Sequence, residues 1–169
     1  MSARVAAIAG LLLMAVLLWG LLRTADSADT TGELRFAPAS GWNQVAGGDA
    51  AITATVPIHD QPGVAHADET VQDLPPTGIV ITAAVSVPAP SNGAGFPERT
   101  LPLDLADADV RHSFEGQPNT AVPEYLMWKR VNGFVLDVRV FFGSQEPTAA
   151  LLAEAQTELD RLAVPSRAA

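Results

Sequence analysis

VPEYLMWKRVNGFVLDVRVFFG, residues 122–143, holds two runs of β-forming side chains on either side of Asn132-Gly133. Asn-Gly is the preferred pair for a two-residue type I′ turn, because both central positions need a positive φ. If that turn forms, Val131 lies opposite Phe134 and the pairing of the two runs follows from there. The stretch therefore predicts an antiparallel β-hairpin with a defined register.

The two faces of this hairpin differ in character. One face is apolar apart from Lys129, and its other members are Tyr125, Met127, Val131, Phe134, Leu136, Val138, Val140 and Phe142. The second face is mixed and places the following side chains opposite one another: Trp128 and Asp137, Leu126 and Arg139, Glu124 and Phe141, and Arg130 and Val135. Because side chains alternate along a strand, the first face is expected in the core and the second is expected to be partly exposed.

The closing segment, residues 147–164, predicts an amphipathic helix. Pro147 fits the first turn, and Pro165 ends the helix. Apolar residues recur at steps of three and four, namely Leu151, Leu152, Ala155, Leu159 and Leu162, whereas Glu154, Glu158 and Arg161 lie off this stripe. A helix with one apolar stripe and a sheet with one apolar face cover each other, so we expect an α+β domain with an antiparallel sheet packed against the C-terminal helix.

Further strands are expected upstream of the hairpin. Residues 52–58 alternate apolar and polar side chains, and Pro57 indicates an edge or an end of that strand. Residues 79–87 alternate over a longer span, with Ile79, Ile81, Ala83, Val85 and Val87 on one face. Residues 59–77 and 88–97 are expected to be loops, and residues 110–114 a short strand.

The N-terminus carries an unbroken apolar run, VAAIAGLLLMAVLLWGLL, at residues 5–22 between Arg4 and Arg23. As a helix it would rise about 27 Å, close to the hydrocarbon thickness of a bilayer. The run is longer than the core of a secretory signal, and Asp26 or Arg23 would disturb a cleavage site after Ala28 or Ala25. We therefore expect an uncleaved signal anchor, a transmembrane helix that makes the membrane a partner of this protein.

Three regions follow from these patterns: a membrane anchor at residues 1–23, a linker at residues 24–48 and a domain at residues 49–169. The linker lacks a sustained period, although Phe36, Trp42 and Val45 could dock its later part onto the domain. Arg4 and Arg23 balance each other, and the free amine tips the orientation towards an N-terminus inside the cell. The domain is then extracytoplasmic and the protein is single-pass.

The charge of the chain excludes some classes of partner. The net charge is −9, and residues 24–120 carry thirteen acidic side chains against three basic ones. Nucleic acids bind through basic patches, so a nucleic-acid partner is not expected. The chain has no cysteine, which excludes disulfides and thiolate metal sites.

One loop could supply metal ligands. Residues 59–69, HDQPGVAHADE, contain His59, His66, Asp68 and Glu69, and histidine with carboxylate suits zinc or a similar divalent ion. The spacing matches no established metal motif, and a solvated acidic loop is the simpler interpretation. No nucleophile motif or cofactor-binding motif occurs elsewhere, so no catalytic residue and no cofactor are assigned.

The mixed face of the hairpin is a candidate interaction surface. It combines Trp128, Leu126 and Phe141 with Arg130 and Arg139, and tryptophan and arginine are enriched in interface hot spots. The alternative is that another layer of the domain covers these rings.

Several segments carry a resemblance: LPPTGIVITAAV (residues 74–85), FPERTLPLDL (96–105), EGQPNTAVPEY (115–125), VNGFVLDVRVFFG (131–143) and EAQTELDRLAVP (154–165). They resemble small single-anchor membrane proteins of high-GC Gram-positive bacteria. The order of a hairpin followed by a terminal helix is similar to that of Mog1/PsbP-like domains, a resemblance that implies a binding module. The leading hypothesis is a non-enzymatic, membrane-tethered module that binds an envelope protein or another envelope component. The alternative is a metal-dependent envelope enzyme that uses residues 59–69.

Overall fold

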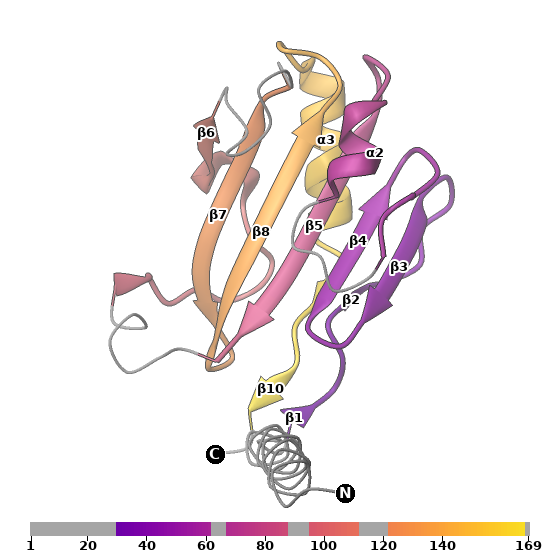
Figure 1. Ribbon diagram of the computed structural model, residues 1–169. Coiled ribbons are helices and arrows are strands. Elements are labelled where there is room, and N and C mark those ends of the chain that lie inside the picture. The colour runs from indigo at the N-terminus through magenta and orange to yellow at the C-terminus, as the bar shows by residue number, and fades with distance from the viewer. Residues whose placement is uncertain (1–29, 62–66, 88–94, 112–121, 168–169) are drawn as a thin grey trace, which may run out of the picture. The chain divides into compact units, whose positions relative to one another are not determined.

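The protein has an α+β fold built on one antiparallel sheet. The computed structural model describes residues 30–61, 67–87, 95–111 and 122–167. The sheet has six strands in the order β3-β4-β5-β8-β7-β6, and helix α3 lies behind it while the shorter helix α2 lies in front (Figure 1). In this spatial order the strands are β3 (Asn43–Gly47), β4 (Ala50–Ala54), β5 (Ile79–Ser86), β8 (Phe134–Phe142), β7 (Glu124–Val131) and β6 (Asp109–Arg111).

The central hairpin forms in the predicted register. Val131 pairs with Phe134, and the ladder continues to the pair of Glu124 with Phe141. Asn132 and Gly133 have φ values of 53° and 84°, the positive values that a type I′ turn requires. The turn and the alternating pattern therefore specify the same pairing.

The main core lies between the sheet and α3 (Ala149–Leu159), as predicted. The apolar face of the hairpin and one face of β5 are buried there together with Ala155 and Leu159 of the helix. The helix is shorter than expected: Thr148 caps it by accepting a hydrogen bond from Leu151 N at 3.3 Å. Leu162 stays buried but belongs to the short strand β9 (Leu162–Ala163).

A second, smaller core lies on the opposite face of the sheet. Helix α2 (Asp68–Gln72) places Val71, with Ala67 just before the helix, against Ile52, Val80 and Phe141. The prediction of an exposed loop over residues 59–77 was therefore wrong at this helix. Its single turn is too short to show a helical period in the sequence, and tertiary packing stabilises it.

The folded domain begins earlier in the sequence than predicted. Strand β2 (Arg35–Phe36) pairs with β9, and β3 is an edge strand of the main sheet. Leu34 and Phe36 are buried in the main core. The compact unit spans Gly32–Ser166, so the predicted linker does not extend to residue 48. Two further short strands, β1 (Thr30–Thr31) and β10 (Ser166–Arg167), form a separate two-stranded sheet.

The predicted membrane anchor, residues 1–23, lies outside the described residues. Within the described part of the chain, no helix is long and apolar enough to cross a membrane.

Candidate functional site

The mixed face of the hairpin continues across β6. Asp109 pairs with Leu126 and Arg111 pairs with Glu124. Side chains of directly paired residues lie on the same face of a sheet, so Asp109 and Arg111 join the face that carries Trp128. This face is opposite to the one covered by α3.

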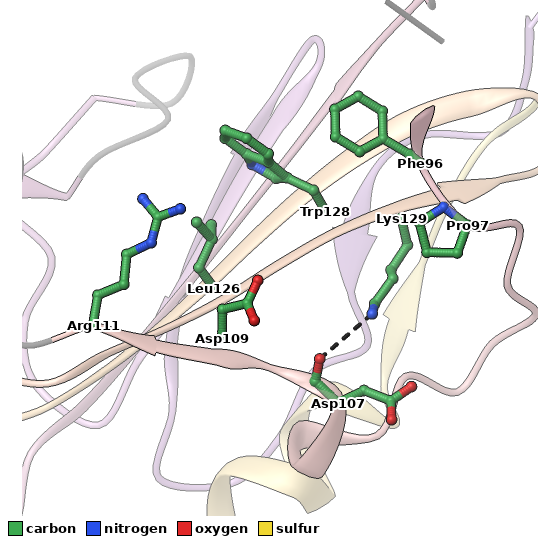
Figure 2. A pocket seen from close by; sticks show the side chains of 8 residues that line it. All are labelled: Phe96, Pro97, Asp107, Asp109, Arg111, Leu126, Trp128 and Lys129. Atoms are coloured by element: carbon green, nitrogen blue, oxygen red, sulfur yellow. Dashed lines mark hydrogen bonds between the residues drawn. The ribbon is translucent and has the colours of Figure 1, made fainter. Parts of the chain in front are cut away.

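Trp128 is the exposed aromatic residue of this face. Its exposed fraction is 42%, although it lies in the middle of an eight-residue strand. Phe96 meets the indole edge-on, with ring centroids 5.7 Å apart and planes at 84°. The guanidinium carbon of Arg111 lies 6.0 Å from the ring centroid, at the limit of a cation–π contact. The indole is thus held between an aromatic ring and a cation (Figure 2).

A hollow of about 250 Å³ opens beside this indole. It is lined by Phe96, Pro97, Asp107, Asp109, Arg111, Leu126, Trp128 and Lys129, which are drawn in Figure 2. The lining combines apolar surface with two carboxylates and two cations. Such a mixture suits a ligand that has both apolar and charged groups.

The hollow lies beside a gap in the backbone hydrogen bonding along the outer edge of β7, the edge that faces away from β8. On one side of the gap β6 pairs as far as Leu126. On the other side the backbone N–H of Arg130 donates to Pro97 O at 2.9 Å, and Arg99 N–H donates to Arg130 O at 2.9 Å. Alternate residues of a strand direct their backbone groups to the same neighbour, so Trp128 N–H and C=O point to the edge on which the hollow lies. Neither outer segment places a residue opposite Trp128.

The charged side chains of the hollow are unequally engaged. The Asp107 carboxylate forms an exposed ion pair with Arg99, with Nε and Oδ2 3.5 Å apart. Lys129 Nζ donates to the backbone oxygen of Asp107 at 3.4 Å (Figure 2, dashed line). Asp109 and Arg111, by contrast, form no ion pair with any residue that the structure describes.

Arg139 lies on the same face of the sheet, on the neighbouring strand β8, and is held by two carboxylates. Its guanidinium donates twice to Asp137, at 3.1 and 3.0 Å, and once to Glu124, at 3.1 Å. Burial lowers the pKa of Arg139, but the hydrogen bond and charge of Asp137, followed by those of Glu124, outweigh it, so the pKa is raised. The side chain is 14% exposed, and its charge is neutralised within the domain. Arg139 is therefore a structural residue on the mixed face, next to Leu126.

The structure separates the five predicted interaction residues. Trp128 and Leu126 both line the hollow. Leu126 is only 3% exposed, so it offers much less surface to a ligand than Trp128 does. Phe141 is fully buried in the core beneath α2, so it does not lie on the surface. Arg130 does not line the hollow and lies near Glu98, with Nε and Oε2 3.6 Å apart.

Sequence reasoning missed six of the eight residues that line the hollow. Phe96, Pro97 and Asp107 come from the segment before the hairpin, Asp109 and Arg111 from the short strand β6, and Lys129 from the face of β7 that was expected in the core. The only local signal was the two-residue spacing of Asp109 and Arg111, which places both on one face of a short strand.

The predicted metal-binding loop does not form a metal site within the described residues. His59 and Glu69 are exposed, Asp68 begins α2, and His66 lies outside the described part of the chain. The neighbouring carboxylate of Asp60 caps α2, because it accepts hydrogen bonds from Glu69 N at 3.2 Å and Thr70 N at 2.9 Å. No group of three His, Asp or Glu side chains in the described segments could hold a metal ion.

Comparisons with protein family models, with curated proteins and with solved structures found no match. The hollow around Trp128 is therefore the basis on which a function can be assigned.

Proposed function

We propose that this protein is a membrane-tethered, extracytoplasmic module that binds an envelope protein through the hollow around Trp128. The observation that carries this proposal is the placement of Trp128, which is 42% exposed yet held by Phe96 and Arg111. Tryptophan in such a setting is the side chain most enriched in binding hot spots.

The surroundings of Trp128 favour binding over catalysis. The titratable side chains lining the hollow are Asp107, Asp109, Arg111 and Lys129. The lining contains no serine, threonine, histidine or cysteine, and of the groups that could act as a general base the Asp107 carboxylate is paired with Arg99 at 3.5 Å. The hollow instead offers a rigid aromatic surface on a sheet whose central strands are eight and nine residues long. A preorganised surface loses little conformational entropy on binding.

The membrane tether is the second part of the proposal. It is supported by the length of the apolar run at residues 5–22 and by the poor cleavage context that follows it. A domain held at the membrane surface meets envelope proteins at a high effective concentration, so a hollow of modest size is sufficient for specific contact.

Affinity capture from membranes tests the binding proposal. Full-length protein and its Trp128→Ala variant are captured after chemical cross-linking, and their melting temperatures are measured alongside. Val110→Ala is the matched control, because Val110 is 48% exposed on the neighbouring strand β6 but lies on the opposite face. We expect Trp128→Ala to lose the captured partner with a nearly unchanged melting temperature. A partner retained by Trp128→Ala would contradict the proposal.

Single introduced cysteines test the orientation, since the natural chain has none. Ala150 is an exposed residue of α3, and an Ala150→Cys variant should react with a membrane-impermeant maleimide in intact cells. A Ser2→Cys variant should react only after lysis. The reverse pattern would place the domain in the cytoplasm.

A further inference from the structure

We infer that the hollow around Trp128 accepts a cationic side chain, arginine or lysine, of the partner protein. Arg111 holds the position beside the indole ring until this ligand displaces it. The inference rests on the proposed function, because it names the chemistry of the partner at the same site.

The indole of Trp128 already has a cation beside it in the structure. The Arg111 guanidinium carbon lies 6.0 Å from the ring centroid, and the ring quadrupole attracts a cation at this range. Arg111 makes no ion pair with the described residues, so none of their carboxylates anchors it there. A ligand cation can therefore replace it without breaking a salt bridge within the described part of the chain.

Asp109 provides the anionic partner for such a ligand. Its carboxylate lines the hollow and forms no ion pair within the described segments, whereas Asp107 is shared with Arg99 at 3.5 Å. A ligand guanidinium between the indole and Asp109 would combine a cation–π contact with a charge-assisted hydrogen bond.

The overall charge favours the same class of partner. The chain has a net charge of −9, so its long-range field attracts basic segments and repels acidic ones. Charge complementarity of this kind acts mainly on the rate of association and on specificity.

The gap in the backbone hydrogen bonding along the outer edge of β7 restricts how the partner enters. An extended peptide cannot pair along β7, because β6 and residues 97–99 occupy its outer edge on both sides of Trp128. Only the backbone groups of Trp128 lie opposite the gap. The ligand must therefore enter with a side chain and not as an added strand.

Peptide titrations with the purified full-length protein test this inference. The probes are acetyl-Gly-Arg-Gly-Arg-Gly-amide and the same peptide with glutamate in place of arginine, and binding is followed by calorimetry at low salt. We expect the arginine peptide to bind and the glutamate peptide not to bind. Trp128→Ala and Asp109→Asn should each weaken binding about fivefold, the range expected for one exposed cation–π or ionic contact.

Arg111 gives the distinguishing result. Because it competes with the ligand, Arg111→Ala should strengthen binding of the arginine peptide about threefold, and Arg111→Lys should have a smaller effect. Glu154→Gln removes the same charge as Asp109→Asn from an exposed position of α3, and it should leave the affinity unchanged within a factor of about 1.5.

Several outcomes would overturn the inference: binding of the glutamate peptide, absence of binding by the arginine peptide, or weaker binding after Arg111→Ala. If any of these occurs while membrane capture still depends on Trp128, the inference of a basic ligand is wrong, but the proposed function stands. If capture is indifferent to Trp128, the proposed function itself fails.

Discussion

The carboxylate of Glu158, in the last turn of α3, accepts a hydrogen bond from the hydroxyl of Thr53 on β4 at 2.9 Å. Gln44 on β3 donates to the same oxygen at 3.1 Å, and Arg161 lies 3.6 Å from the other. Glu158 is 1% exposed, although the helical pattern placed it off the apolar stripe. The carboxylate thus links the C-terminal helix to the strands at one edge of the sheet.

The burial of Glu158 makes the stability of the domain depend on pH. Burial raises its pKa above the usual 4.5, and the hydrogen bonds from Thr53 and Gln44 and the charge of Arg161 offset this only in part. The folded state therefore holds the proton more tightly than the unfolded state. The contribution of Glu158 to the free energy of unfolding is largest below pH 4.5. It is lost as the pH rises through the raised pKa of Glu158 in the folded state.

Glu158→Gln should remove this dependence. The free energy of unfolding of the natural protein, relative to the variant, is expected to be larger at pH 4 than at pH 7, as measured by urea denaturation. Glu154→Gln, an exposed change on the same helix, should follow the natural protein at both values. A natural protein that gains stability over Glu158→Gln as the pH rises would contradict the assignment.

Arg139→Met should destabilise the domain by about 3 kcal/mol, because it leaves the carboxylates of Glu124 and Asp137 without their cation. Urea denaturation at pH 7 measures the loss. Adding Glu124→Gln and Asp137→Asn to this variant should restore part of the stability, since the two unpaired charges are then removed. If Arg139→Met is neutral, the buried network does not contribute as described.

Gly143→Ala should cost about 2 to 3 kcal/mol through overpacking. Gly143 N–H donates to Gly78 O at 3.0 Å, and a Cβ at this position would overlap the carbonyl oxygen of Pro75. Gly95→Ala is the control, because beyond its chain neighbours no atom of the described residues lies within 4 Å of its Cβ position. Thermal unfolding of the two variants distinguishes them, and equal melting temperatures would rule out the close approach.

Gly133→Ala should lower the free energy of unfolding by about 1 kcal/mol, because φ at this turn position is 84°. Asn132→Gly keeps the backbone freedom of the turn but loses the hydrogen bond from Asn132 Nδ2 to Val164 O, which is 3.2 Å long. Its effect should be smaller. Denaturant unfolding of both variants gives the comparison, and a neutral Gly133→Ala would argue against the type I′ turn.

Local patterns were sufficient to predict the central part of the fold. The turn at Asn132-Gly133 and the alternation around it specify the register of β7 and β8, and the three- and four-residue steps specify α3. Strand β2 and helix α2 were missed because they are short and are stabilised by distant partners, as in the pairing of β2 with β9. Strand β3 pairs with the adjacent strand β4, with Gly47 opposite Ala50, but its residues were assigned to the linker.

The candidate site was predictable only in its centre. Pairing within the hairpin placed Trp128 and Leu126 on one face, and the structure confirms this arrangement. Whether a ring on that face is covered depends on other segments, and α2 covers Phe141 while leaving Trp128 exposed. Arg111 reaches the indole through the pairing of β6 with β7, which no local pattern indicates.

The most direct test of binding at the hollow is site-specific photo-crosslinking in native membranes. A photoreactive amino acid replaces Pro97, which lines the hollow, and in a matched variant it replaces Val110 on the opposite face of β6. We predict one discrete protein adduct from position 97, lost when Trp128→Ala is added, and none from position 110. An adduct from position 97 that persists without Trp128, or an equal adduct from position 110, would contradict a binding site at this hollow.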